Sequence, residues 1–305
     1  MSDVQLDDRD LRQHGFGVRL HEAMREFGPL CVGIDPHPHL LAEAGLPDSA
    51  EGLERFSQTI LEAVGGQVAA VKPQSAFFER HGSAGIAVLE RVLADCASAD
   101  TLSILDVKRG DIGSTMTAYA QAYVLDGAPL AADAITVSPY LGYESLRPCI
   151  DVAREHGRGV FVLALTSNPE GASVQQQGEP SVAAQIITEV GYDNASISGT
   201  AGQRRSGFDP ALVPGHVGLV IGATRADALT SLGLLEPLRD SRAIVLAPGV
   251  GAQGATPADL AAAFAGHTAY VLAPVSRGVL AQGLSVAAIR SASASFGTAL
   301  GEALR

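Results

Sequence analysis

Eight short runs of aliphatic residues recur along the chain, and segments of helix-forming composition separate them. The runs are continuous rather than alternating, which is typical of parallel strands that are covered on both faces. Eight strand–helix repeats predict an α/β protein, an eight-stranded parallel (β/α)8 TIM barrel, with an open doubly wound sheet as the alternative. The expected strands lie at residues 30–35, 68–73, 102–108, 134–138, 159–166, 217–223, 243–248 and 269–274.

The remaining segments extend this repeating pattern. An N-terminal helix is expected at residues 8–28, before the first strand, and an amphipathic helix at 285–304 closes the chain. A long insertion, 168–216, follows strand 5. A helix is expected within it at 180–191, followed by a tail, 194–214, that is rich in Gly, Ser and Arg. The insertion could act as a lid, a dimer contact or a passive excursion. No linker divides the chain, so residues 1–305 are expected to form a single barrel domain. Other helices are expected at 51–64, 84–96, 114–125, 145–156 and 256–265.

Charge and cysteine content exclude several classes of protein. The formal net charge of −12 argues against binding to nucleic acid or to an anionic membrane. The N-terminus is acidic and polar, unlike a signal peptide, and no apolar stretch reaches the length of a membrane span. The three cysteines, Cys31, Cys96 and Cys149, are odd in number and far apart, which excludes a full disulfide framework and shows no zinc spacing. A cytoplasmic location is therefore expected.

The chain contains only two lysines, beside nineteen arginines, and each lysine ends a predicted strand. A compact ammonium and a guanidinium are not interchangeable in a tight pocket, so the placement of Lys72 and Lys108 is informative. In a β/α barrel the active site lies at the carboxyl ends of the strands. The residues that follow the predicted strands are rich in charged and hydroxyl groups: Asp35, Lys72, Asp106, Lys108, Asp111, Ser138, Ser167, Asn168, Thr224, residues 249–253, Ser276 and Arg277.

The third strand carries the densest group of charges. Asp106 and Lys108 are two residues apart, so both face the same side of a strand, and Asp111 follows near the start of a helix. Two carboxylates beside an ammonium keep it protonated and available as a proton donor. A buried ion pair by itself contributes little stability, so three charges at a strand end favour a functional site over packing.

These residues also carry a resemblance. The segment 106–112, Asp-Val-Lys-Arg-Gly-Asp-Ile, resembles the Asp-x-Lys-x-x-Asp-Ile signature of orotidine 5′-phosphate decarboxylases. Val107 stands where that family would be expected to have a smaller residue. The similarity covers nearly the whole chain and is greatest to the longer bacterial subfamily. It includes residues 33–36, 71–78, 136–142, 166–171, 221–224, 247–254 and 276–278.

The resemblance implies decarboxylation of orotidine 5′-phosphate to UMP and CO2, in de novo pyrimidine biosynthesis. It implies that Lys108 protonates C6 of the pyrimidine and that Asp106 lies against the substrate carboxylate. Asp35 and Lys72 would bind ribose hydroxyls and complete an alternating charge array. The further binding residues that it implies are Ile112 and Pro248, which shape the pocket, Ser167 at the pyrimidine amide, and Gln253 and Arg277 at the 5′-phosphate.

The resemblance also implies a homodimer with a shared active site, in which Asp111 and Thr115 reach into the site of the partner subunit. No cofactor and no metal are expected. The carbanion left at C6 lies in the ring plane and cannot delocalise, so a fixed ammonium in a dry site must stabilise it electrostatically. Remote binding energy from the phosphate would hold the charged array in place.

Two motifs are typical of other functions, but the sequence around each argues against that function. The glycines 249, 251 and 254 match a dinucleotide fingerprint, but they occur late in the chain and lack the acidic residue expected after the next strand. A phosphate loop after the seventh barrel strand explains them better. His37 and His39 resemble the His-x-His of metal-dependent barrels, but the later strand ends carry Thr166 and Thr224 in place of histidine.

Two other functions remain open from the residues alone. A sugar-phosphate relative on the same barrel, such as a keto-gulonate-phosphate decarboxylase or a hexulose-phosphate synthase, would share the Asp-x-Lys-x-x-Asp pattern but require Mg2+. A non-catalytic barrel would bind UMP without turnover. Ile112 and the segment 167–169 favour the pyrimidine decarboxylase, and the intact lysine–aspartate array argues against a protein that only binds.

Overall fold

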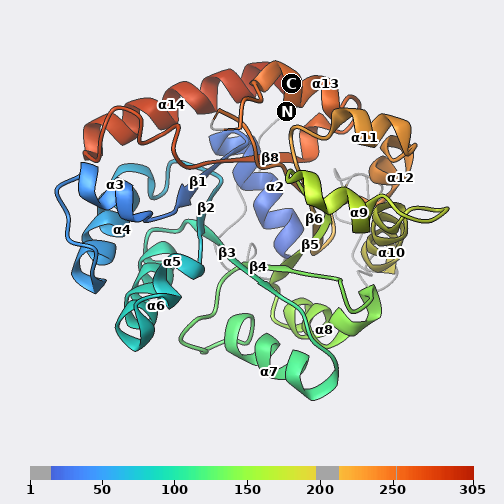
Figure 1. The fold of residues 1–305 in the computed structure, drawn as a ribbon, viewed down its shortest axis with the longest axis horizontal. Helices are drawn as coiled ribbons and strands as arrows, with labels where there is room; N and C mark the ends of the chain where they lie inside the picture. The colour runs from blue at the N-terminus through green and yellow to red at the C-terminus, as the bar shows by residue number, and fades with distance from the viewer. Residues whose placement is uncertain (1–14, 197–212, 252) are drawn as a thin grey trace, which may run out of the picture.

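A closed barrel of eight parallel strands forms the centre of the molecule (Figure 1). The computed structural model describes residues 15–196, 213–251 and 253–305. The strands pair in chain order, and β8 pairs back onto β1, which confirms the predicted barrel and rules out the open sheet. They are β1 (Leu30–Ile34), β2 (Ala70–Pro73), β3 (Leu102–Arg109), β4 (Ala134–Val137), β5 (Gly159–Leu165), β6 (Val217–Ile221), β7 (Val245–Leu246) and β8 (Val271–Val275).

Helices surround the barrel, and each expected helix is present within the described residues. They include α2 (Phe16–Phe27), α4 (Ala50–Val64), α6 (Gly82–Ser98), α7 (Gly113–Tyr123), η1 (Tyr143–Leu146), α8 (Arg147–Glu155), α10 (Val182–Ser196), α13 (Pro257–Ala263) and α14 (Val286–Ala303). Shorter helices that the sequence pattern did not predict are α3 (Pro38–Glu43), α5 (Ala76–Glu79), α9 (Ala172–Gln175), α11 (Ala226–Ser231) and α12 (Leu235–Asp240), with η2 (Pro169–Gly171) and η5 (Thr268–Tyr270). Residues 8–14 and most of the tail 194–214 lie outside the described residues.

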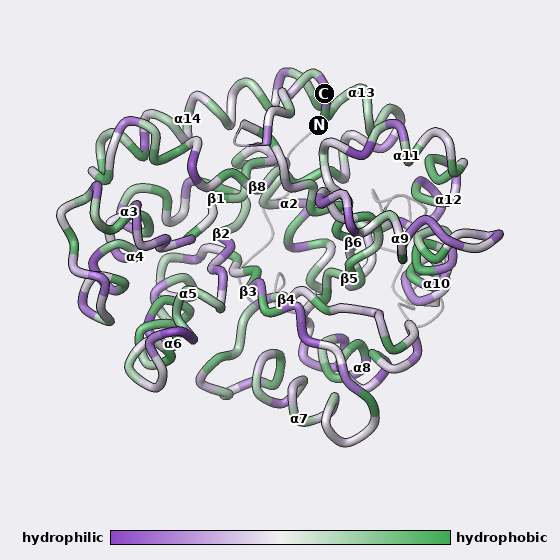
Figure 2. The backbone as a smooth tube through the Cα atoms, viewed as in Figure 1, coloured by the Kyte–Doolittle hydropathy of each residue, from purple (hydrophilic) through white to green (hydrophobic). Residues whose placement is uncertain are grey.

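Alternate strand residues face the barrel interior, where they form an apolar layer separate from the barrel–helix interface. Cys31, Ile104, Phe161 and Leu246 belong to this inner cluster, whereas their apolar chain neighbours pack outward against the helices. Figure 2 shows the hydrophobic strands at the centre and the more hydrophilic segments toward the periphery. The outward face is also apolar, which explains why the strands read as continuous hydrophobic runs.

Helix α2 closes the amino end of the barrel. Its buried residues Phe16, Leu20 and Met24 join the inner cluster, and the rings of Phe16 and Phe161 meet edge-on with centroids 5.9 Å apart. A side chain at position 159 would collide with the Phe16 ring, so only glycine at this position allows α2 to lie in the amino end of the barrel as a plug. The interior is therefore a packed core at this end and is open to a ligand only at the other.

The long connection after β5 contains the helix that links β5 to β6. Helix α10 packs against both strands, and its residues Ala183, Ile187 and Val190 are fully buried at helical spacing. The additional material that the structure describes is therefore short, namely η2 and α9, which lie at the carboxyl end of β5. Among the described residues, no helix is both long and apolar enough to cross a membrane.

Candidate active site

A pocket of about 600 Å³ opens at the carboxyl ends of the barrel strands. Inward-facing positions above the apolar layer supply its charged wall, because the residues two further along from Ala70, Ile104 and Ala134 are Lys72, Asp106 and Thr136. Apolar residues at its base include Leu163, Val220 and Leu246. The predicted site residues that line it are Asp35, Lys72, Asp106, Lys108, Ser167, Pro248, Gln253 and Arg277.

Asp106 is the centre of the charged cluster. One carboxylate oxygen, Oδ1, accepts from the Lys108 ammonium at 2.6 Å and from the Thr136 hydroxyl at 2.7 Å. The other, Oδ2, accepts from Lys72 at 3.1 Å and from the Gln74 amide at 3.0 Å. Burial alone would raise the pKa of Asp106, but the two ammoniums and the hydrogen bonds hold it well below its usual range. Asp106 is therefore a permanently ionised carboxylate with a fixed orientation.

Lys72 lies between two carboxylates. Its side chain is 10% exposed, and its Nζ is 3.1 Å from Asp106 and 4.0 Å from Asp35, the second distance being too long for a hydrogen bond. Burial by itself would lower the pKa of Lys72, but Asp106 and then Asp35 outweigh it and raise the pKa above its ordinary value. Charges of opposite sign thus alternate from Asp35 through Lys72 and Asp106 to Lys108.

Lys108 is the most accessible member of this row. Its side chain is 48% exposed, compared with 9% for Asp106, so the ammonium lies at the boundary between the buried cluster and the open pocket. An ammonium in that position can contact a ligand and remain paired with Asp106. The prediction that Asp106 and Lys108 face one side is confirmed by their shared contact.

Three predicted residues do not line this pocket. Asp111 follows β3 and accepts a hydrogen bond from the backbone amide of Ile112 at 2.8 Å, and it does not contact Lys108. Ile112 is 62% exposed, and Thr115 is exposed on the first turn of α7. Within one chain the structure therefore assembles Asp106 and Lys108 but leaves Asp111 outside the cluster.

The glycine-rich loop lies directly after β7, where a phosphate loop was expected. Gly249, Gly251 and Gly254 all have positive φ, which favours glycine, and a bridge between Val250 and Ala255 closes the loop. Gln253 in this loop and Arg277 after β8 both line the pocket. Their neighbouring strands place an amide and a guanidinium at the same side of the opening.

Several residues that sequence reasoning did not assign complete the site. Gln74 and Thr136 hold Asp106, and Gln175 of α9 binds the exit of β5 by accepting from the Thr166 amide at 2.9 Å. Thr166 and Gln175 line the pocket, together with Val174 of α9. Gln74 and Thr136 belong to segments that carry the family resemblance, but only their contacts reveal their role. The start of the insertion is thus a wall of the pocket.

His37 and His39 lie side by side, with ring centroids 5.3 Å apart. In the described part of the chain, no three His, Cys, Asp or Glu side chains are grouped so that they could hold a metal ion. The His37 ring also packs against Phe77, with ring centroids 4.1 Å apart. The three cysteines are buried and free.

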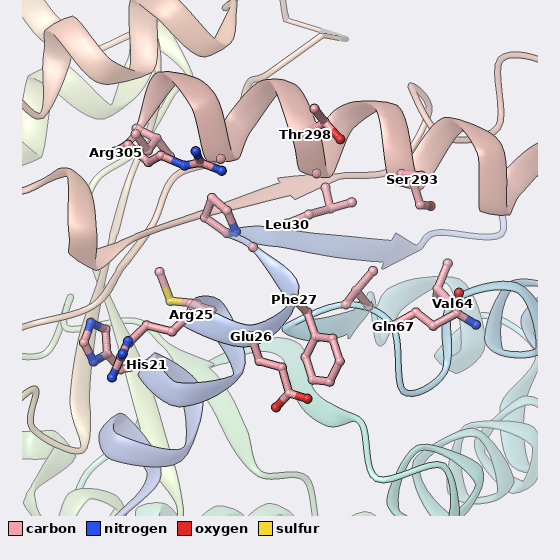
Figure 3. A pocket seen from close by; sticks show the side chains of 18 of the residues that line it. His21, Arg25, Glu26, Phe27, Leu30, Val64, Gln67, Ser293, Thr298 and Arg305 are labelled. Atoms are coloured by element: carbon pink, nitrogen blue, oxygen red, sulfur yellow. The ribbon is translucent and has the colours of Figure 1, made fainter. Parts of the chain in front are cut away.

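A second pocket, of about 620 Å³, lies at the opposite end of the barrel, between α2 and α14 (Figure 3). Its lining includes Arg25, Gln67 and Ser293. The α2 plug and the apolar inner layer separate it from the charged cluster. The charged cluster at the strand ends therefore does not reach this second pocket.

The closed barrel and the charged pocket at its carboxyl end define a β/α-barrel enzyme. A family model, orotidine 5′-phosphate decarboxylase / HUMPS, matches residues 28–292. The chain belongs to this family.

Named relatives agree with this assignment. The orotidine 5′-phosphate decarboxylase of Streptomyces coelicolor is 52% identical over 285 residues, which are 92% of this chain and 95% of the relative. That of Salinispora arenicola is 53% identical over 281 residues, covering 91% and 94%. A crystal structure of a candidate orotidine 5′-phosphate decarboxylase from Streptomyces avermitilis superposes with a TM-score of 0.85 at 48% identity, covering 98% and 99%.

Proposed function

We propose that this protein decarboxylates orotidine 5′-phosphate to UMP and CO2, in the synthesis of pyrimidine nucleotides. The observation that carries the proposal is the row Asp35, Lys72, Asp106 and Lys108 at the carboxyl end of the barrel, in a chain about half identical to enzymes of that name. The family model also covers relatives beyond these decarboxylases, so the substrate needs a direct test.

Lys108 acts as the proton donor in this proposal. Loss of CO2 leaves an electron pair at C6 in the plane of the ring, where no π system can accept it. The half-exposed Lys108 ammonium faces the pocket, and its 2.6 Å contact with Asp106 orients it. It stabilises the developing carbanion and then transfers a proton to C6.

Asp106 contributes a fixed negative charge rather than a base. Four donors already occupy its oxygens, and its pKa lies well below the usual range, so it does not take up a proton at neutral pH. A substrate carboxylate placed beside it experiences repulsion that is relieved when CO2 leaves. Lys72 of β2 and Asp35, which directly follows β1, bind the ribose hydroxyls.

The other end of the substrate binds at the β7 and β8 exits. Arg277 and Gln253 hold the 5′-phosphate. Pro248 and Ser167 instead flank the pyrimidine, and Ser167 contacts its amide edge. A guanidinium suits a phosphate because it offers a planar fork of donors. Phosphate binding supplies energy that orders the pocket around the reacting carbon.

A homodimer completes the site. Asp111, Ile112 and Thr115 lie outside their own pocket, and Ile112 is joined by Tyr140 and Leu141 as exposed apolar side chains near the pocket rim. Delivery of these residues to the partner's pocket would bury them and bring Asp111 to Lys108. This arrangement accounts for a charged residue of the signature that lies outside the charged cluster of its own chain.

The deciding experiment is an assay in EDTA. Purified protein is mixed with orotidine 5′-phosphate, and the loss of ultraviolet absorbance is followed together with UMP formation. Conversion without added metal supports the pyrimidine decarboxylase. No conversion, together with Mg2+-dependent turnover of a sugar phosphate, would instead assign the protein to the sugar-phosphate enzymes. UMP binding without turnover of either substrate would indicate a protein that only binds nucleotide.

A further inference from the structure

The pairing of β3 with β4 is irregular at the two catalytic residues. Leu105 lies opposite Ile135, but the next paired residues are Arg109 and Val137. Residues 106–108 of β3 therefore face Thr136 alone on β4. A bulge of this kind bends the strand and redirects its side chains, and such bulges are enriched beside active sites.

Lys108 has a backbone conformation that suits its place in the bulge but is unusual for its residue type. Its φ is +46°, in the left-handed region that residues with a side chain seldom occupy. Glycine would adopt this conformation more readily, but glycine would remove the ammonium. Surrounding contacts must therefore hold the backbone of Lys108 in place.

Thr136 provides that contact. Its hydroxyl oxygen accepts from the Lys108 backbone amide at 3.0 Å, so it replaces the strand acceptor that the bulge has displaced. The same hydroxyl donates to Asp106 Oδ1 at 2.7 Å, and the Lys108 ammonium reaches that oxygen at 2.6 Å. Thr136 is buried, with 1% of the residue exposed. The Thr136 hydroxyl therefore binds the backbone of Lys108 directly, and it orients the Asp106 carboxylate that binds the Lys108 ammonium.

We infer that Thr136 is a positioning residue for the proton donor: it holds the β3 bulge so that the Lys108 ammonium stays at its catalytic position. This inference rests on the proposed role of Lys108. Thr136 acts through Lys108 and Asp106, so its loss should affect the chemical step more than the binding of nucleotide. The β-branched shape also matters less than the hydroxyl, since only the oxygen joins the two residues.

The test compares two substitutions at this position. Thr136→Val keeps the shape and removes the hydroxyl, whereas Thr136→Ser keeps the hydroxyl and removes a methyl group. We expect Thr136→Val to lower kcat about 10- to 100-fold, as small displacements of catalytic groups do. The KM and the Kd for UMP should remain within about twofold. Thr136→Ser should recover most of kcat.

Two results would overturn the inference. One is a kcat for Thr136→Val within about twofold of wild type. The other is a parallel loss of kcat, UMP affinity and melting temperature in both variants, which would indicate a structural role only. Should Thr136→Val not fold, Thr136→Cys, with a weaker donor and acceptor of similar size, is measured against the same limits. Wild-type protein without activity on orotidine 5′-phosphate would instead remove the proposed function itself.

Discussion

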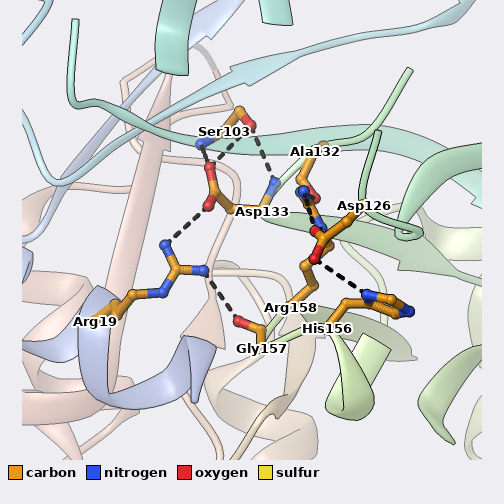
Figure 4. Close-up of polar contacts among 8 residues, drawn as sticks. All are labelled: Arg19, Ser103, Asp126, Ala132, Asp133, His156, Gly157 and Arg158. Carbon is orange, nitrogen blue, oxygen red and sulfur yellow. Dashed lines mark hydrogen bonds and ion pairs between the residues drawn. The ribbon is translucent and has the colours of Figure 1, made fainter. Parts of the chain in front are cut away.

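Arg19 of α2 donates a hydrogen bond to Asp133, which lies 114 residues further along the chain, at 2.9 Å (Figure 4). The same guanidinium donates to the Gly157 carbonyl at 3.0 Å, and Asp133 also accepts from the amide of Ser103 at 3.0 Å. These contacts join the α2 plug to the starts of β3, β4 and β5. A helix that precedes the barrel is thereby fixed to its amino end.

Arg19→Met should lower the free energy of unfolding by about 1–3 kcal/mol, because it leaves the partly buried carboxylate of Asp133 with one donor fewer. The matched control is Arg91→Met, whose ion pair with Glu54 is far more exposed and should cost less than about 0.5 kcal/mol. Urea unfolding compares the two. Since the active site lies at the other end of the barrel, kcat should not change, and an equal effect from both variants would contradict the role of α2.

Lys108→Ala should reduce turnover of orotidine 5′-phosphate below detection and leave UMP binding measurable. The ammonium is the only side-chain donor assigned to the reacting carbon, whereas the phosphate contacts lie elsewhere in the pocket. Single-turnover assays and calorimetric titration with UMP provide the two measurements. Retained turnover would remove Lys108 as the proton donor.

Mixing Asp106→Asn and Asp111→Asn subunits should restore activity to two inactive preparations. If Asp111 completes the partner's site, each heterodimer contains one site with both native carboxylates and one site with neither. Random exchange then produces half of the dimers as heterodimers, so activity should approach about a quarter of the wild-type value per subunit. Activity that stays at the level of the separate variants after exchange would argue against a shared site.

Arg277→Ala should weaken UMP binding about 10- to 100-fold, because hydrogen bonds to a charged group contribute about 1.5–3 kcal/mol. Arg277 follows β8 and lines the pocket together with Gln253 of the glycine-rich loop. Uridine has no phosphate, so its weaker affinity should be the same in both proteins. Equal losses for UMP and uridine would mean that the substitution perturbs the pocket generally.

His267 should make the protein less stable below neutral pH. Burial is the main reason that the pKa of His267 is lowered to about 4, and the nearby Arg239 adds to it. The unfolded chain, with a histidine pKa near 6.5, binds the proton more readily, so stability falls as pH decreases from about 6.5 to 4. The full effect is on the order of 3 kcal/mol.

Urea unfolding at pH 7, 6 and 5 measures this dependence. His267→Gln retains a side-chain donor for the Ala243 carbonyl, which His267 contacts at 2.9 Å, and cannot become charged. The variant should therefore lose less stability than wild type over this range. His216 is also buried with a pKa lowered to about 4, so it should account for the pH dependence of stability that remains in the variant. An unchanged slope in the variant would contradict the prediction.

The sequence by itself determined the barrel and the composition of its charged end. Each strand is buried on both faces, so the eight strands appear as continuous aliphatic runs, and the structure places each within a residue or two of its expected ends. The two lysines were informative for the same local reason, since a charge that ends a buried strand must face the open end of the barrel. Short helices such as α9 and α11 were missed because their few residues carry no clear periodicity.

Only the tertiary structure decided how those charges are arranged. The bulge that sets Lys108 against Asp106, and the Thr136 hydroxyl that holds it, depend on the register between β3 and β4, which leaves no mark in either strand's composition. The same holds for Arg19, whose partner Asp133 lies just before β4, 114 residues further along the chain. Local patterns encode burial and strand period, whereas hydrogen bonds between distant residues exist only once the barrel closes and brings their atoms within 3 Å.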